Sequence, residues 1–145
     1  MTTVLSPVKE WKGVKVIIYA PTWIHDSVIL GKDTKIGAFN NIDEDVVIGA
    51  GNNIQPMCTI SEGTRIGNGN FIGPDCHFYN DKYVNSTITP PTIGNYTRLG
   101  GSIVILPGVH IGDNCFICAG AMITKDVPDG TQILPDKGKK GRVVW

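Results

Sequence analysis

Three neighbouring residues, His77, Asn80 and Asp81, combine a side chain that can transfer a proton with side chains that can hold a polar substrate. An imidazole changes charge near neutral pH, so His77 is a candidate general base. Asn80 could orient a substrate or stabilise an oxyanion, and Asp81 could accept a proton or a hydroxyl hydrogen bond. Asn and Asp also favour turns, so the same pair could simply begin a loop.

A regular repeat surrounds these three residues and must position them. Aliphatic or aromatic residues recur at every sixth position in two runs, with no exception inside either run. A period of six matches neither the 3.6 of a helix nor the alternation of a simple strand. It indicates short strands joined by tight turns, with a bulky residue inside each flat face. The positions are Ile24, Leu30, Ile36, Ile42, Ile48, Ile54, Ile60, Ile66, Ile72, Phe78, and then Ile93, Leu99, Ile105, Ile111, Ile117 and Ile123.

Two further features indicate how the repeat is built. Glycine follows the bulky residue in many hexads, and we expect it to supply turn conformations that a Cβ would resist. A small, β-branched or Asn residue comes four positions after the bulky one. Asn52 and Asn70 are 18 residues apart, as are Cys58 and Cys76, so each pair would stack as a ladder between parallel strands. We interpret these ladders as structural rather than as metal or redox sites.

The length of the chain fits a single domain, residues 1–145. Residues 1–23 are expected to form an N-terminal cap, in which the apolar run at 14–19 is a strand that covers the first edge of the solenoid. The coils are expected over residues 24–127. Residues 128–145 form a tail, because Pro128 cannot donate to a ladder.

The repeat is interrupted once, between Phe78 and Ile93. Residues 79–92 supply 14 residues where the period allows five, so nine are extra. Such an insertion is a loop on one face of a solenoid, and loops of this kind commonly form the binding surface. The interruption therefore puts His77, Asn80 and Asp81 at the root of the expected binding loop.

Three segments carry a resemblance to a known family. Over residues 24–130 the repeat resembles the hexapeptide-repeat acyltransferases. The segment F-I-G-P-D-C-H-F-Y-N-D at 71–81 resembles F-I-G-P-x-V-x-F-T-N-D of nucleotide-linked 3-amino-sugar N-acetyltransferases. The segment G-A-M-I-T-K-D-V-P at 120–128 resembles the closing coil G-A-V-V-T-K-D-V-P of hexapeptide acetyltransferases. The fold that this resemblance implies is all-β, a left-handed parallel β-helix of a little over five coils with one protruding loop.

The resemblance also implies an activity and a set of residues. A homotrimer would bind acetyl-CoA as co-substrate in the groove between subunits and acetylate a nucleotide-linked amino sugar. A backbone N–H of Gly101 or Ser102 would donate to the thioester carbonyl, and Gly120 and Ala121 would let the pantetheine arm approach. Lys125 would lie near the CoA phosphates. The tail departs from the family's G-N-P-A-K ending, and its basic residues would either hold the 3′-phosphate or remain solvated: Lys137, Lys139, Lys140 and Arg142.

Composition limits the kinds of partner that we expect this protein to bind. The formal net charge is zero, so bulk attraction to nucleic acid or to an anionic membrane is not indicated. No run approaches the roughly 20 apolar residues of a membrane span, and lysines interrupt the N-terminal segment, so we expect a cytoplasmic protein without a signal peptide. We expect no metal.

Several alternatives stay open at this stage. A sugar O-acetyltransferase would need a firm histidine base, and a non-catalytic β-helix would bind or scaffold without acetyl-CoA. A zinc carbonic anhydrase of the same fold would need three converging histidines, and only His25, His77 and His110 exist. Cys115 and Cys118 have a redox-like spacing, but the coil itself dictates it.

Overall fold

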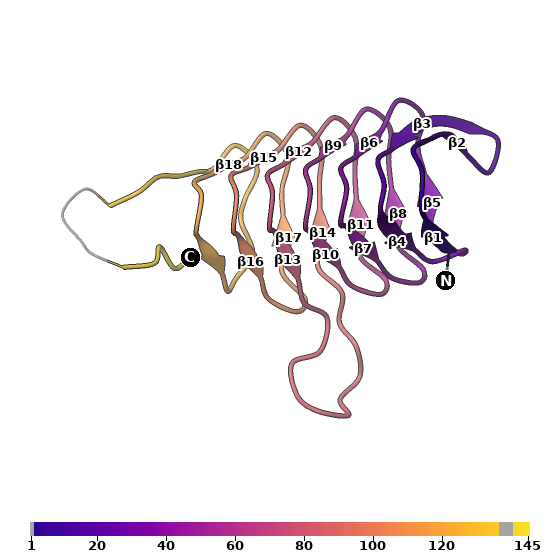
Figure 1. The fold of residues 1–145 in the computed structure, drawn as a ribbon. Coiled ribbons are helices and arrows are strands. Elements are labelled where there is room, and N and C mark those ends of the chain that lie inside the picture. Colours follow the sequence, from indigo (N-terminus) through magenta and orange to yellow (C-terminus); the bar gives the residue numbers. More distant parts are fainter. Residues whose placement is uncertain (1, 137–140) are drawn as a thin grey trace.

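The chain folds as a left-handed parallel β-helix of about six turns, triangular in cross-section, with short strands on three sheets (Figure 1). A computed structural model describes residues 2–136 and 141–145. All its regular elements are strands, 20 in number within those residues, and most are two residues long. No helix in the described ranges is long and apolar enough to cross a membrane.

We name the three sheets A, B and C. Sheet A contains β1 (Thr2–Val4), β4 (Thr22–Ile24), β7 (Asn41–Ile42), β10 (Thr59–Ile60), β13 (His77–Phe78), β16 (Val104–Ile105) and β19 (Met122–Ile123). Sheet B contains β2 (Val8–Trp11), β3 (Val14–Ile18), β6 (Lys35–Ile36), β9 (Asn53–Ile54), β12 (Phe71–Ile72), β15 (Arg98–Leu99), β18 (Phe116–Ile117) and β20 (Gln132–Ile133). Sheet C contains β5 (Ile29–Leu30), β8 (Val47–Ile48), β11 (Arg65–Ile66), β14 (Thr92–Ile93) and β17 (His110–Ile111). The chain runs repeatedly from B to A to C, so the turns stack in three corners, B–A, A–C and C–B.

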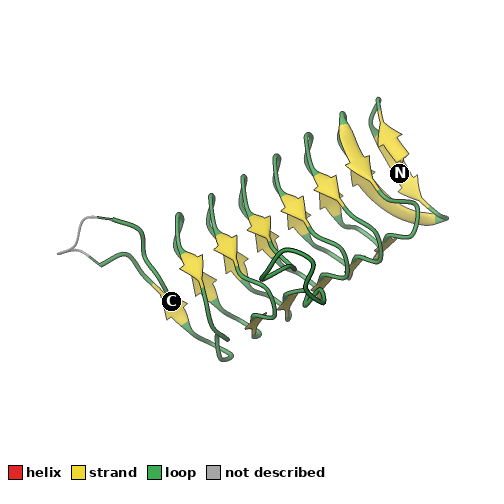
Figure 2. Ribbon diagram, turned by 90° about the horizontal axis from the view of Figure 1, so that it is seen from below, coloured by secondary structure: helices red, strands yellow, loops and turns green. Residues whose placement is uncertain are grey.

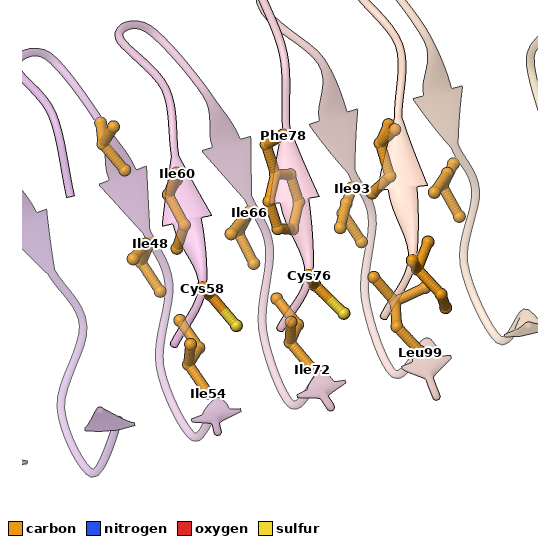
Figure 3. Close-up of a cluster of buried hydrophobic side chains, with 14 of the residues drawn as sticks. Ile48, Ile54, Cys58, Ile60, Ile66, Ile72, Cys76, Phe78, Ile93 and Leu99 are labelled. Atoms are coloured by element: carbon orange, nitrogen blue, oxygen red, sulfur yellow. The ribbon is translucent and has the colours of Figure 1, made fainter. Parts of the chain in front are cut away.

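The bulky residue of each hexad faces the inside of the helix, as its period predicts. Each of the sixteen hexad positions is buried, and like positions stack on one another between coils (Figure 3). Ile60 pairs with Phe78 and Ile42 in register, for example. Burial of this continuous apolar column is the main favourable term for a solenoid whose strands are too short to be stable alone.

A ladder of polar side chains runs inside the C–B corner. Asn52 donates through Nδ2 to the Gly67 carbonyl at 2.8 Å, and its Oδ1 accepts from the Asn70 N–H at 2.9 Å. Asn70 repeats both bonds one coil further on, to Gly94 and from Thr97. Each side chain therefore satisfies two buried backbone groups of the next coil, which confirms that the Asn ladder is structural.

The glycine after each bulky residue has a different function from the one we expected. Gly31 has no positive φ; a Cβ there would lie 2.3 Å from the backbone carbon of Gly49 in the next coil. The left-handed conformation occurs two residues later, at Asp33, with φ 61°. Glycine directly after the bulky residue is required because stacked coils approach closely. The turn conformation belongs to the position two residues later, which is glycine in some turns, such as Gly51 with φ 68°, and another residue in others.

Both ends of the solenoid are covered. At the first end, β1 pairs antiparallel with β4 and β2 antiparallel with β3, and β3 lies within the run at 14–19 that we expected to be a strand. At the other end the ladder continues beyond residue 127, because β20 pairs with β18 in parallel. Residues 141–145 then fold back against β19, where the Met122 N–H donates to the Val143 carbonyl at 2.8 Å (Figures 1 and 2).

The inserted segment 79–92 leaves the A–C corner as a single protruding loop (Figure 1). Its two ends are fastened by hydrogen bonds from the Thr89 N–H to the Asn80 carbonyl, 2.7 Å, and from the Gly108 N–H to the Thr89 carbonyl, 2.8 Å. The loop therefore enters and returns between two ordinary turns of the corner, and the coils on either side of it stay in register.

Candidate active site

His77 lies on the outer surface of sheet A, immediately before the protruding loop. Because Phe78 points into the core, the alternation of β13 turns His77 outward, where 29% of its side chain remains accessible. Its Nε2 is 2.8 Å from Oδ1 of Asp75, and its Nδ1 has no hydrogen-bond partner within the described residues. The ring also stacks on Tyr79, with centroids 6.4 Å apart. His77 is thus fixed at one edge and one face, with one nitrogen free.

The other two histidines are held differently. In His25 the Nδ1 atom is bonded to Ser27, and Glu44 lies 3.9 Å from Nε2. In His110, on sheet C, the Nδ1 atom is 2.6 Å from the hydroxyl of Thr92. Only His77 combines a close carboxylate with a free ring nitrogen among these three. The geometry therefore supports its assignment as the candidate base.

Asp75 connects His77 to the next coil. Its second oxygen, Oδ2, accepts a hydrogen bond from the Ser102 hydroxyl at 2.9 Å. The bonds from His77 and Ser102 hold the pKa of the Asp75 carboxyl below its ordinary value. Asp75 is consequently ionised at neutral pH and can keep a proton on Nε2 of His77, which leaves the Nδ1 lone pair free.

Asn80 and Asp81 are engaged in building the loop. Asn80 donates through Nδ2 to the Glu62 carbonyl at 3.0 Å. Oδ1 of Asp81 accepts from the Tyr83 N–H at 3.2 Å and from the Ser86 hydroxyl at 2.5 Å. These contacts give both residues a structural function at the loop root, as the turn interpretation predicted. Oδ2 of Asp81 has no partner in the described residues, so a contact with substrate stays a prediction.

The B–A corner leaves backbone donors without acceptors. Neither the Gly101 N–H nor the Ala119 N–H, one coil further on, makes a hydrogen bond within residues 2–136 and 141–145. At the C–B corner the N–H of Asn68 occupies the matching position and donates to Oδ1 of Asn95 at 2.8 Å. The B–A corner has Pro, Gly and Ala in that position, so no side chain can cover these two amides.

Gly101 and Ser102, the two residues proposed to donate a backbone N–H to the thioester carbonyl, differ in whether that N–H is available. The Ser102 N–H donates to the Pro74 carbonyl at 2.8 Å, so it is not available to a thioester. The Gly101 N–H is free, and Ala119 is a second candidate that the sequence did not reveal. An acyl carbonyl needs donors of this kind, and small side chains let it approach them. That these amides bind the acyl end of acetyl-CoA stays a prediction.

The remaining predicted cofactor residues are divided between the two edges of sheet A. Gly120 lies at the B–A corner, where its carbonyl accepts from Nε of Arg142 at 2.8 Å. Arg142 also donates to the Ser102 carbonyl at 3.2 Å, so it fastens the tail to the corner. The side chain of Ala121 is fully buried in the core, and an approach of the pantetheine arm to its backbone stays a prediction. Lys125 lies at the A–C corner over the ring of Trp145, 5.1 Å from its centroid.

Two other groups of residues that the sequence singled out are the lysines of the tail and the four cysteines. Lys137, Lys139 and Lys140 lie outside the described residues. The four cysteines are buried free thiols, and Sγ of Cys115 donates to the Pro128 carbonyl at 3.2 Å. Within the described ranges no three His, Cys, Asp or Glu side chains are grouped so as to hold a metal ion.

Comparison with known proteins identifies the family of this chain. The family described as "Bacterial transferase hexapeptide (six repeats)" matches residues 27–62 and 90–125, on either side of the loop. The chain therefore belongs to the hexapeptide-repeat transferase family. The galactoside O-acetyltransferase of Escherichia coli (strain K12) is 56% identical over 39 residues, which are 27% of this chain and 19% of that protein.

Two solved structures share the fold over 82% of this chain. One is PerB from Caulobacter crescentus in complex with CoA and GDP-perosamine, with a TM-score of 0.72, 24% identity and 53% of that chain covered. The other is the acetyltransferase domain of PglB from Neisseria gonorrhoeae FA1090, with a TM-score of 0.71, 21% identity and 54% covered. The chain spans about half the length of these neighbours, and likeness at such identities shows the fold alone.

Proposed function

We propose that this protein is an acetyl-CoA-dependent N-acetyltransferase that acts on a nucleotide-linked amino sugar. The observation that carries the proposal is the free Nδ1 of His77, held by Asp75 on sheet A between the loop root and the unbonded Gly101 amide. PerB, a neighbour of the same fold, was solved with CoA and a nucleotide-linked sugar, which supports this class of substrates.

The proposed reaction forms one bond and breaks one. The neutral sugar amine attacks the acetyl carbonyl carbon, and Nδ1 of His77 accepts the proton that the nitrogen loses as the C–N bond forms. The Gly101 N–H donates to the oxyanion of the tetrahedral intermediate. Collapse of the intermediate breaks the C–S bond, and the proton passes to the CoA thiolate, which leaves an acetamido sugar and free CoA. Thioesters are reactive, so positioning supplies much of the acceleration.

The proposal includes assembly and location. Exposed apolar side chains on successive coils, among them Trp23, Phe39 and Met57, offer surface that a homotrimer would bury. In the trimer, the amino sugar and acetyl-CoA would meet beside the loop of one subunit. The proposed location of the protein is the cytoplasm. Light scattering of the purified chain would give three times the monomer mass.

The test is release of thiol from acetyl-CoA with a panel of nucleotide-linked 3-amino and 4-amino sugars. Replacement His77→Gln should lower kcat by roughly 10²–10⁴-fold, the usual contribution of a general base. The matched control His110→Gln removes an exposed histidine from sheet C and should retain activity. The absence of both CoA binding and turnover across the panel would refute the proposal.

A sugar O-acetyltransferase is the second candidate, favoured by the firm pairing of His77 with Asp75. A hydroxyl is a weaker nucleophile than an amine, so it needs such a base more. Two measurements separate the candidates. Nucleotide-linked sugars without an amine would be turned over only by an O-acetyltransferase, and hydroxylamine would cleave only an ester product.

A further inference from the structure

We propose that Asp75 and Ser102 form a positioning relay that fixes the tautomer and the orientation of His77. The expected effect of the relay on kcat rests on the proposed function. Its effect on which nitrogen of the imidazole carries the proton does not, because that effect is present without substrate. His77 is the catalytic residue in this scheme, and Asp75 and Ser102 act through it.

The relay crosses from one coil to the next. Asp75 and Ser102 occupy the same position of the repeat, the third residue after the bulky one, at the B–A corner. They are 27 residues apart, which is one 18-residue coil plus the nine extra residues of the loop. Both have left-handed φ values, 60° and 55°, and this conformation brings the hydroxyl of Ser102 to 2.9 Å from Asp75.

Each member of the relay is itself anchored. The Asp75 N–H donates to the Pro56 carbonyl at 3.1 Å, and the Ser102 N–H to the Pro74 carbonyl at 2.8 Å. The Ser102 carbonyl accepts from Arg142 of the tail. The carboxylate therefore has one oxygen held by Ser102, and the other is left to accept from Nε2 of His77 alone.

The chemical consequence concerns which ring nitrogen carries the proton. A carboxylate only accepts, so it keeps the proton on Nε2 and the lone pair on Nδ1. When Nδ1 takes the substrate proton, the negative charge of Asp75 stabilises the imidazolium that forms. A surface ion pair of this kind adds little to stability. Its effect is on the proton position and on the ring angle.

The decisive variant is Asp75→Asn. Asn keeps the size of the side chain and tolerates the left-handed conformation, so the variant should fold. Its amide can donate to Nε2, which would shift the proton to Nδ1. Nitrogen chemical shifts of the three histidine rings, with His77 assigned from the His77→Gln variant, should show the Nε2–H form in the native protein and a gain of the Nδ1–H form in Asp75→Asn.

The kinetic arm uses the same variants. Asp75→Asn should lower kcat by roughly 10²-fold with the KM for acetyl-CoA unchanged, because the base is misprotonated while the cofactor contacts remain. Ser102→Ala and Ser102→Gly should each lower kcat by roughly three- to tenfold, the loss expected for one typical hydrogen bond. The matched control Asp33→Asn makes the same change at the same position of the repeat in the C–B corner, where φ is also left-handed at 61°, and should leave both readouts unchanged.

The outcomes separate the relay from the proposed function. An unchanged tautomer in folded Asp75→Asn overturns the relay, as does native kcat in both Ser102 variants. A protein without acetyltransferase activity refutes the proposed function, and the nitrogen shifts still decide the relay. If Asp75→Asn does not fold, Asp75→Gly carries the test, because glycine accepts the left-handed φ of 60° and removes the carboxylate. An unchanged population of the Nε2–H form in that variant overturns the relay.

Discussion

The polar ladder inside the C–B corner makes a quantitative prediction for Asn52→Val. Asn52 is 1% exposed, and the substitution removes the only side-chain bonds to the Gly67 carbonyl and to the Asn70 N–H. An unsatisfied buried backbone group costs about 1–3 kcal/mol. Two such groups give an expected loss of about 2–6 kcal/mol in the free energy of unfolding.

The matched control is Asn52→Thr, which differs from Asn52→Val by one hydroxyl. Thr34 occupies the same position one coil earlier, where its Oγ1 donates to the Gly49 carbonyl at 2.7 Å and accepts from the Asn52 N–H at 3.2 Å. Threonine can therefore make both bonds, and Asn52→Thr should lose less than about 1.5 kcal/mol.

Denaturant unfolding followed by circular dichroism, at one protein concentration, measures the difference between the two variants. We expect Asn52→Val to be less stable than Asn52→Thr by about 0.5–6 kcal/mol. Equal midpoints for the two variants would show that the ladder bonds do not stabilise the coil stack, and would refute the reasoning.

Three further predictions follow from the geometry. Gly67→Ala should prevent or severely weaken folding, because its Cβ would lie 2.4 Å from the Gly94 carbonyl oxygen, and soluble yield with circular dichroism would show it. The pKa of the Asp75 carboxyl should lie below its ordinary value, so its ionised form persists as the pH falls past that value. Loss of one donor in Ser102→Ala should raise this pKa; the carboxyl carbon chemical shift followed against pH measures it, and an unchanged titration would contradict the bond. The hydrogen bond with the Cys58 thiol, together with burial, raises the pKa of the Cys76 thiol. Iodoacetamide should therefore leave Cys76 unmodified in the native protein and alkylate it after denaturation, as mass spectrometry of the peptides can verify.

The repeat was predictable because its cause is local and periodic. A bulky residue every sixth position can be buried only if the chain turns after each short strand, so the run from Ile24 to Phe78 was enough to indicate a solenoid. The insertion at 79–92 was visible for the same reason, since it breaks a strict period. The function of glycine was not predictable, because the closeness of Gly31 to Gly49 arises from stacking between coils and not from the turn that contains Gly31.

The sequence also indicated part of the site. It gave His77 as the candidate base and the loop root as its neighbourhood, and the structure supports the histidine by its pairing. Asp75 and Ser102 were missed, although a step of 27 across the insertion connects the same position of the repeat. The unbonded Ala119 amide was missed, although the absence of Asn or Asp from the matching positions of the B–A corner is the signal that could have revealed it.

The sequence by itself determined the period, the inward face of every hexad and the location of the loop. These depend on the burial of apolar side chains at fixed spacing, which is written in residue types. Only the tertiary structure decided which polar groups of distant segments meet: the carboxylate of Asp75 with Ser102, and the tail's Arg142 with Gly120. Such contacts form between coils, at distances of a few ångströms set by stacking, and side chains far apart in the chain reach one another only after the coils have packed.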